Sequence, residues 1–366
     1  HVDVLVAGGG PAGAAAAAAA CTRGLAVELV AAPARRLHPG ESLPPGTEVV
    51  LDGLFGDDPL RWRGHQPAYG NRSAWGGAGL EQTDFMVNPL GHGWHVDRRA
   101  LDASLLQSLR ARGVRVRGAT RVAHSSWNGD CWEVMLAGNR PGVQARAVVD
   151  ATGRAARIAR SQGACRTRLD RLVAAYWLLA STRERERDST TLVDAVPDGW
   201  WYTTPIPGRR VVAFLTDADL LPPRAARTPA QWHERLALAP NVANILATAR
   251  LKLSPAPMIA DASVAYLNRL TGPGWAAAGD AAVSFDPLSS QGMVTALLMG
   301  RDAGQAVAAL LTTADPQPLV DYGHDYATLL QTHMRMRTAY YELEQRWPDA
   351  PFWTRRRALK AIDSRR

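Results

Sequence analysis

The chain opens on the stretch VDVLVAGGGPAG (Val2–Gly13), which decides its fold. An apolar run typical of a buried strand leads into three glycines, and seven alanines (residues 14–20) follow at the start of a predicted helix. In this strand–turn–helix context Gly8 permits the tight turn, Gly10 lets the backbone approach a pyrophosphate, and Gly13 lets helix and strand pack closely. The unpaired N–H groups and partial positive charge at the helix N-terminus would then bind the phosphates. We therefore predict a Rossmann-like α/β domain that binds a dinucleotide.

Length, charge and cysteine content narrow the functional class. The 366 residues allow one large or two interleaved domains, and no apolar run is long enough to cross a bilayer. The net charge of +8 is carried almost entirely by arginine, and the arginines are dispersed without the interleaved aromatic residues of a nucleic-acid surface. We expect an anionic cofactor or an acidic partner instead. Cys21, Cys131 and Cys165 lack metal-ligand spacing, so we predict free thiols, no metal site and a cytoplasmic protein.

Hydrophobic patterns divide the chain into segments of two kinds. Leu101, Leu105 and Leu109 recur every four residues on one face of a predicted helix, and residues 275–280 form another buried strand ending in Gly-Asp. Residues 172–216 instead contain a series of short strand patterns, which predict a mixed β-sheet on the substrate side. We assign residues 1–53, 91–165 and 265–315 to the nucleotide-binding domain, residues 54–90 and 166–264 to an interleaved substrate domain, and residues 316–366 to a C-terminal segment of charged, aromatic-bearing helices.

Four motifs occur in the order found in one family of flavoproteins. They are Gly8–Gly13, Arg98 ahead of Leu101-Asp102, VDATG (149–153) and Gly279-Asp280. With them the chain resembles flavoprotein monooxygenases of the para-hydroxybenzoate hydroxylase fold over most of its length. The resemblance implies FAD as cofactor, with Arg98 touching its pyrophosphate and Asp280 its ribose or ribitol. Taken alone, Arg98 also fits a surface ion pair and Asp280 a helix N-cap.

Further stretches indicate a narrower branch. GESLPP (40–45), GHGWHVDR (91–98), FDPLSSQG (285–292) and YYELEQRWP (340–348) resemble the tryptophan-halogenase-like flavoproteins. That branch includes halogenases and also maturases that oxygenate a tryptophan of a partner polypeptide during tryptophylquinone biogenesis. The resemblance implies that the loop 287–292 lies against the flavin pyrimidine ring, where its N–H groups and the dipole of the next helix stabilise negative charge.

The resemblance supplies the candidate site residues. Those expected to bind FAD are Gly8, Gly10, Pro11, Ala12, Gly13, Arg36, Ser42, Arg98, Gly153, Gly279, Asp280, Pro287, Gln291, Gly292 and Met293. Those expected near the reacting atoms are Glu41, Trp75, His92, Pro287 and Ser289. Structural alternatives stand beside several of them: a turn hydrogen bond for Glu41, satisfied loop histidines for His92 and His95, and core packing instead of an aromatic pocket wall for Trp75, Trp200, Trp201 and Tyr202.

The chain departs from the family pattern in three places. Nothing between residues 1 and 251 is lysine, and Arg72 is no substitute for the halogenase lysine because a guanidinium stays protonated. The halogenase Trp-x-Trp-x-Ile-Pro motif is degraded to WWYTTPIP (200–207). Ala31 replaces the acidic residue that holds the adenosine ribose, and alternation places Glu28 on the other face, so Arg35 or Arg36 would have to compensate. The missing lysine and the degraded motif favour oxygenation over halogenation.

We predict an FAD-dependent monooxygenase that uses a flavin C4a-hydroperoxide to hydroxylate an electron-rich aromatic ring. An indole needs no strong base, consistent with the absence of an obvious one. The favoured substrate is a tryptophan side chain in a partner polypeptide, with O2 as co-substrate. Electrons would come from NAD(P)H or a separate flavin reductase, since no second G-x-G-x-x-G is visible. The alternatives are a small-molecule aromatic hydroxylase or flavin-dependent halogenase of secondary metabolism, and a non-catalytic flavoprotein chaperone. No nucleic-acid or membrane partner is expected.

Overall fold

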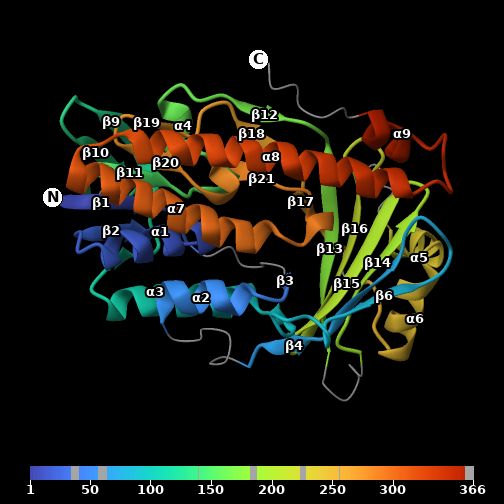
Figure 1. The fold of residues 1–366 in the computed structure, drawn as a ribbon. Coiled ribbons are helices and arrows are strands. Elements are labelled where there is room, and N and C mark those ends of the chain that lie inside the picture. Colours follow the sequence, from blue (N-terminus) through green and yellow to red (C-terminus); the bar gives the residue numbers. More distant parts are fainter. Residues whose placement is uncertain are drawn as a thin grey trace.

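The computed structural model describes residues 1–33, 41–56, 64–138, 140–181, 188–222, 228–254 and 256–358. Two large sheets lie towards opposite ends of the molecule, and two long helices, α7 (Gly292–Thr313) and α8 (Gln317–Leu343), run across it side by side (Figure 1). The first sheet carries the glycine turn, and α8 extends from this sheet to the second.

The first sheet has a parallel core with antiparallel strands at its edges. The parallel strands lie in the order β20-β11-β1-β2-β8. Ala7 pairs with Asp150 and Asp150 with Ala277, so the turns after β1, β11 and β20 emerge at the same edge. Three of the sequence motifs therefore converge there. The strands of this sheet are β1 (Val2–Ala7), β2 (Val27–Val30), β8 (Arg115–Arg117), β9 (Val122–Trp127), β10 (Trp132–Leu136), β11 (Arg140–Asp150), β19 (Thr271–Gly272) and β20 (Trp275–Ala277).

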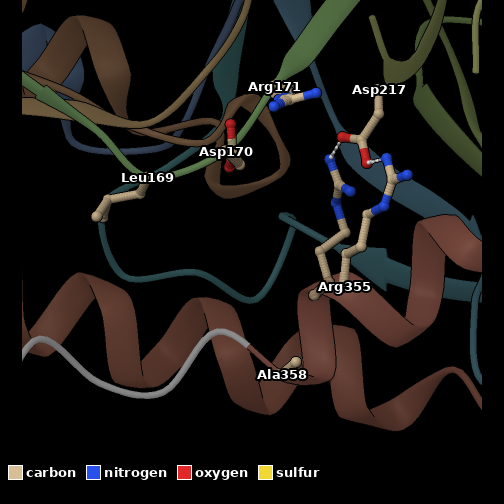
Figure 2. A pocket seen from close by; sticks show the side chains of 7 residues that line it. Leu169, Asp170, Arg171, Asp217, Arg355 and Ala358 are labelled. Atoms are coloured by element: carbon tan, nitrogen blue, oxygen red, sulfur yellow. Dashed lines mark hydrogen bonds and ion pairs between the residues drawn. The ribbon is translucent and has the colours of Figure 1, made fainter. Parts of the chain in front are cut away.

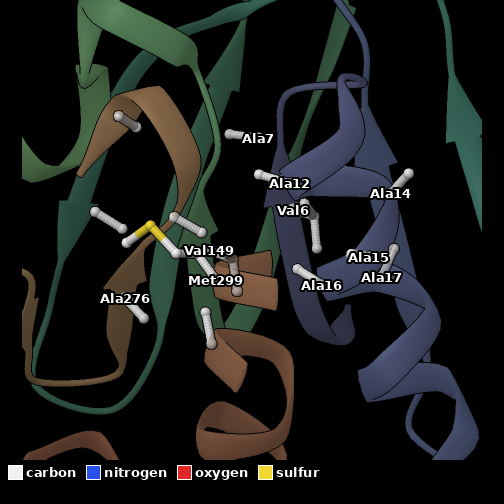
Figure 3. Close-up of a cluster of buried hydrophobic side chains, with 14 of the residues drawn as sticks. Val6, Ala7, Ala12, Ala14, Ala15, Ala16, Ala17, Val149, Ala276 and Met299 are labelled. Atoms are coloured by element: carbon white, nitrogen blue, oxygen red, sulfur yellow. The ribbon is translucent and has the colours of Figure 1, made fainter. Parts of the chain in front are cut away.

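Helix α1 (Pro11–Thr22) is built largely of alanine because it is enclosed by its neighbours. Residues 11–20 are all buried, and α1 packs against α7, α2 (Thr47–Phe55), α3 (Arg98–Ala111) and the first sheet. A Cβ on Gly300 would lie 2.1 Å from the carbonyl oxygen of Ala12, so this glycine lets the backbones of α7 and α1 touch. Figure 3 shows Ala12 and Ala16 of α1 in the cluster that also contains Met299 of α7. The contact sets the N-terminal end of α1 against the third turn of α7.

The second sheet is mixed. Its strands lie in the order β17-β13-β16-β15-β14-β5-β6, antiparallel apart from the parallel β14–β5 pair. Trp201 packs with Trp177 in the cluster that includes residues of α5 (Pro229–Ala237) and α6 (Pro240–Thr248), whereas Trp200 belongs to the cluster on the opposite face. Trp200 and Trp201 therefore do not line one pocket together. The strands are β5 (Gly70–Ala74), β6 (Glu81–Asp84), β13 (Leu172–Ala180), β14 (Thr191–Val196), β15 (Gly199–Ile206), β16 (Arg209–Asp217) and β17 (Met258–Asp261).

Smaller elements join the two sheets. One three-stranded sheet contains β3 (Glu41–Leu43), β7 (Gly93–Val96) and β4 (Gln66–Ala68), and another contains β12 (Arg166–Arg168), β18 (Ala265–Leu267) and β21 (Val283–Ser284). The short helix α4 (Arg157–Ser161) follows β11. The helices at the C-terminal end are α8 and α9 (Pro351–Ala358).

The C-terminal helices tie the two sheets together. Helix α8 has 27 residues and is therefore about 40 Å long. Near its start Tyr322 donates a hydrogen bond to the carbonyl of Ala277 in β20 (2.6 Å), and near its end Tyr341 accepts one from Trp200 Nε1 in β15 (3.3 Å). The predicted fold, a Rossmann-like domain with a mixed sheet and C-terminal helices, is confirmed. No helix in the described ranges combines the length and apolarity needed to cross a membrane.

Candidate functional site

The glycine turn leaves an open space at its centre. Gly8 has φ +125°, and a Cβ there would lie 2.0 Å from the carbonyl oxygen of Ala151. A Cβ on Gly13 would lie 1.9 Å from the carbonyl oxygen of Gly8. At Gly10, in contrast, a Cβ would meet no described atom within 4 Å. The first and third glycines therefore serve packing, while the second faces a space that a bound phosphate group can enter.

Both helices that lie beside the Gly-Asp motif have uncapped N-termini. Among the described residues no side chain caps α1, whose N-cap is Gly10, or α7, whose N-cap is Gln291. Helix α3, by comparison, is capped by Asp97, which accepts a hydrogen bond from Ala100 N. A Cβ on Gly279 would touch Ala12 of α1 (2.7 Å) and Ala296 of α7 (3.5 Å), so the first turn of α1 and the second turn of α7 meet at the Gly-Asp motif. Their free N–H groups and positive dipole ends suit an anionic ligand that spans both.

Arg98 and Glu41, 57 residues apart, are brought together near Asp280 of the Gly-Asp motif, because the charges of both affect the pKa of Asp280. Arg98 Nη1 donates a hydrogen bond to Glu41 Oε1, and its Nε lies 3.4 Å from Asp102 Oδ1. Burial alone would lower the pKa of Arg98, but the carboxylates of Glu41 and Asp102 outweigh it and raise the pKa. The ion pair that the sequence allowed for Arg98 is thus present, with 11% of the arginine side chain exposed. Its contact with a pyrophosphate stays a proposal.

Arg98→Met is expected to weaken FAD binding about tenfold to a hundredfold, because a hydrogen bond to a charged group contributes ~1.5–3 kcal/mol. The matched control is Arg146→Met. Arg146 pairs with Asp3 at 3.1 Å, near Ala145 and Val2 at the amino end of the parallel strands, away from the glycine turn. Quenching of FAD fluorescence on titration with each variant measures the affinity. Equal dissociation constants for FAD in the two variants would show that Arg98 does not contact the cofactor.

The small sheet that carries Glu41 also meets the second sheet. Burial raises the pKa of Tyr202, in β15, and the negative charge of Glu41 contributes to the same shift. The Tyr202 hydroxyl interacts with the backbone at Ser42. The predicted residues Glu41, Ser42 and Arg98 therefore lie where the small sheet meets the second sheet.

The motifs after β11 and β20 have different local roles. Asp150 is fully buried and accepts hydrogen bonds from Thr152 N (3.0 Å) and from the amides of Ile158 and Ala159 in α4 (2.8 Å each), so it fixes the turn. A Cβ on Gly153, the next predicted residue, would meet no described atom within 4 Å. The side chain of Asp280 is 51% exposed, 3.7 Å from Arg154 Nε. Asp280 is therefore accessible to a ligand at the shared edge of the strands.

The loop ahead of α7 is exposed at the residues predicted to face the flavin. Pro287, Gln291 and Gly292 are exposed, whereas Met293 is buried under the helix. The hydroxyl of Ser289 donates to the carbonyl of Asp286 (2.9 Å), which makes it part of the turn itself. The loop thus presents backbone groups rather than the serine side chain.

The aromatic and histidine candidates lie in packed surroundings. Trp75 donates from Nε1 to the carbonyl of Tyr340 (2.8 Å) and makes edge contacts with the rings of Trp200, Tyr341 and Trp353. His92 Nδ1 lies 2.8 Å from the carbonyl oxygen of Gly93, and its ring contacts Trp94 and Tyr69. His95 is fully buried, with hydrogen bonds at both ring nitrogens to Ser189 O and Thr204 Oγ1. This geometry favours packing for Trp75 and a satisfied histidine for His95.

Ala31 and Glu28, which the sequence placed near the predicted adenosine site, have packing and ion-pair roles within the first sheet. Ala31 is small because it lies against Gly9, where a Cβ would be 2.7 Å from its own. Glu28 is fully buried and bound to Arg115 (3.1 Å) and Arg117 (2.5 Å) of β8, so it is engaged within the sheet. Arg36, and Arg35 beside it, lie outside the described residues. Their proposed role at the cofactor stays a prediction.

The contacts between α8 and Asp286 were not predicted from the sequence. His333, Arg337 and Tyr341 of α8 all bind Asp286 in the loop ahead of α7. Their spacing of four residues was a visible signal for one helix face, but it did not reveal which segment that face contacts.

A pocket of about 480 Å³ lies at α9 and the start of β13. Figure 2 shows its lining: Leu169, Asp170, Arg171, Asp217, Arg355, Arg356 and Ala358. None of the predicted site residues is among them, and the carboxylate of Asp217 binds two of the arginines. Within the described ranges no group of three or more His, Cys, Asp or Glu residues could hold a metal ion.

Comparison with known proteins agrees with this geometry. The family described as FAD dependent oxidoreductase (DAO) matches residues 90–305, more than half of the chain. The chain is 27% identical over 300 residues to the FAD-dependent oxidoreductase LodB of Marinomonas mediterranea, covering 81% of this chain and 80% of that protein. It is 27% identical over 373 residues to the tryptophan 2-halogenase of Chondromyces crocatus, covering 96% and 70%. The structure is similar to that of QhpG, a peptidyl tryptophan dihydroxylase essential for tryptophylquinone cofactor biogenesis, with a TM-score of 0.79 and 25% identity, covering 98% of this chain and 79% of QhpG.

Proposed function

Because this chain belongs to the family of FAD-dependent oxidoreductases, we propose that it is a monooxygenase that hydroxylates an aromatic ring, namely a tryptophan side chain in a partner polypeptide. The observation that carries the cofactor assignment is the uncapped N-terminus of α1 at the open space beside Gly10. Bound and reduced, FAD supplies the electrons that activate O2, while the protein holds the cofactor and the ring in place and excludes water.

Different residues of the chain bind different parts of the cofactor. The N–H groups of α1 and the guanidinium of Arg98 bind the pyrophosphate, and Asp280, half exposed at the strand edge, binds a ribose or ribitol hydroxyl. The N-terminus of α7 faces the flavin ring, where its dipole stabilises negative charge. Donors that the fold holds in place stabilise charge without having to reorganise.

The chain's own residues support oxygenation over halogenation. The region where the halogenase lysine is expected holds Arg72 in β5, whose guanidinium pairs with Asp188 and donates to Thr190 Oγ1 (2.8 Å). Arg72 therefore serves to join β5 to the region ahead of β14. A permanently charged guanidinium in an ion pair cannot take the place of a lysine amine. The similarity to a tryptophan 2-halogenase keeps halogenation as the outcome that the experiment must exclude.

A polypeptide substrate is supported by similarity and by surface chemistry. QhpG acts on a peptidyl tryptophan. In this chain the connection from β6 to β7 exposes Met86, Val87 and Leu90 by 82%, 89% and 59%. It leads directly into β7, which pairs with the strand that carries Glu41. Adjacent exposed apolar side chains of this kind are typical of surfaces that bind other chains.

The test compares substrate classes under one set of conditions. The protein is supplied with FAD, NADH, a flavin reductase and O2, and offered a library of tryptophan-containing peptides, free tryptophan or a simple phenol. We expect kcat/KM for the best peptide to exceed that for free tryptophan by about a hundredfold, because flanking contacts lower the barrier by ~2.7 kcal/mol. Product masses identify the modified residue. Preferential modification of free tryptophan or of the phenol would overturn the polypeptide assignment.

A further inference from the structure

The loop between β21 and α7 is held in place by the hydrogen bonds of one residue, Asp286. The side chain of Asp286 is 1% exposed, although residues 287, 290 and 291 beside it are exposed. Its Oδ1 accepts a hydrogen bond from Leu288 N (3.0 Å), which closes the turn. Its Oδ2 accepts two more, from Arg337 Nε (2.8 Å) and Tyr341 Oη (3.1 Å). The position of the exposed loop therefore depends on what holds Asp286.

The partners of Asp286 outside the loop form one face of α8. His333, Arg337 and Tyr341 are spaced by four residues and are all buried. Burial lowers the pKa of His333 to about 4, so the ring is neutral and its Nε2 accepts a hydrogen bond from the Asp286 amide (3.4 Å). The backbone and the carboxylate of Asp286 are thus held by the same helix.

Arg337 connects this loop to the second sheet. Its Nη2 lies 2.8 Å from Asp170, just ahead of β13, while its Nε binds Asp286. The side chains of Arg337, Asp170 and Asp286 are exposed by only 1%, 5% and 1%. The Arg337 Cζ also lies 4.8 Å from the ring centre of Tyr341. Without the guanidinium, two buried carboxylates would lose their shared cation, which is strongly unfavourable.

We propose that Arg337 is a positioning residue for FAD: by binding Asp170 and Asp286 together, it fixes the loop 285–291 and the uncapped N-terminus of α7 against the flavin ring. The inference rests on the cofactor placement of the proposed function. Fixed N–H groups stabilise negative charge on reduced FAD without reorganising. A mobile loop loses conformational entropy when it becomes ordered, and this loss offsets part of the binding free energy. Releasing the loop therefore weakens FAD binding and makes reduction of bound FAD harder.

Arg337→Lys tests the proposal, because lysine keeps the charge but lacks the planar fork that reaches both carboxylates. In the cofactor-free protein we expect backbone amides of residues 287–293 to exchange with deuterium about tenfold faster. We expect the dissociation constant for FAD to rise about tenfold. The midpoint potential of bound FAD should shift to more negative values. Arg335→Gln, an exposed position on the same helix, is the matched control and should change none of these.

Tyr341→Phe provides a second variant if Arg337→Lys does not fold. It keeps the ring and removes the hydroxyl, which donates to Asp286 and also accepts from Trp200 Nε1, so we expect the same three changes at about threefold in exchange and affinity. Unchanged amide protection and an unmoved potential in a folded variant would overturn the proposal, as would a lower melting temperature with the potential unmoved. None of these measurements needs a substrate. A failure to oxygenate tryptophan would therefore leave them intact, and the two failures are distinguishable.

Discussion

Gly10→Ala is expected to fold with wild-type stability and to bind FAD about a hundredfold more weakly, a loss of ~2.7 kcal/mol. The backbone at Gly10 has φ −84° and ψ −176°, which alanine adopts without strain, and the added Cβ meets no described atom within 4 Å. The methyl group therefore costs nothing in the free protein. It occupies the space into which the pyrophosphate must come.

Gly13→Ala is the matched variant with the opposite expected signature. Its Cβ would lie 1.9 Å from the carbonyl oxygen of Gly8, a backbone atom that cannot move without opening the turn. Forced overpacking of this kind is expected to cost about 3 kcal/mol of unfolding free energy. Urea denaturation of the cofactor-free proteins and FAD titration separate the two effects. Wild-type FAD affinity in Gly10→Ala would show that the pyrophosphate does not bind at this turn.

Asp217→Asn is expected to lose about 3–5 kcal/mol of unfolding free energy, because it leaves a buried arginine without its counter-ion. Asp217 Oδ1 binds Arg356 (2.7 Å) and its Oδ2 binds Arg355 (2.9 Å). The Arg356 side chain is only 1% exposed, with its Cζ 3.6 Å from the ring centre of Phe352. The ion pair therefore holds α9 against the end of β16, and its loss should release α9.

Asp219→Asn is the control for this variant. Asp219 binds the same Arg355 at 2.8 Å, but its side chain is 40% exposed and that of Arg355 44%. An exposed pair contributes at most about 1 kcal/mol. Urea denaturation monitored by the fluorescence of the twelve tryptophans, Trp353 in α9 among them, measures both variants. Equal losses in the two would show that burial of Arg356 does not determine the stability of this corner.

The parts predicted from sequence are those encoded locally. The glycine turn can be predicted because a strand, a turn and a helix follow one another within a single short stretch. Parallel strand order then explains why VDATG (149–153) and Gly279-Asp280 reach the same edge as Gly8–Gly13. Family resemblance placed Arg98 and Glu41 at the same site, and the structure adds that they bind each other.

The parts that could not be predicted depend on contacts between distant segments. Asp286 binds Arg337 and Arg337 binds Asp170, which is 167 residues away, and no local periodicity encodes such a pairing. An arginine in a helix is also more often solvated than buried, so the composition of α8 did not predict that Arg337 is buried. The opposite faces of Trp200 and Trp201 follow from strand alternation once β15 is known, but which face each one covers depends on helices packed from elsewhere.

The central claim is that this chain uses FAD and O2 to put oxygen, not halogen, on a tryptophan ring. The most direct test supplies the protein with FAD, NADH, a flavin reductase, ¹⁸O2 and bromide together, and offers it the tryptophan peptide that is modified fastest. Mass spectrometry of the product then identifies the atom gained and its source. We predict ¹⁸O on the indole and no bromine, whereas a brominated indole, or oxygen drawn from water instead of O2, would contradict the account.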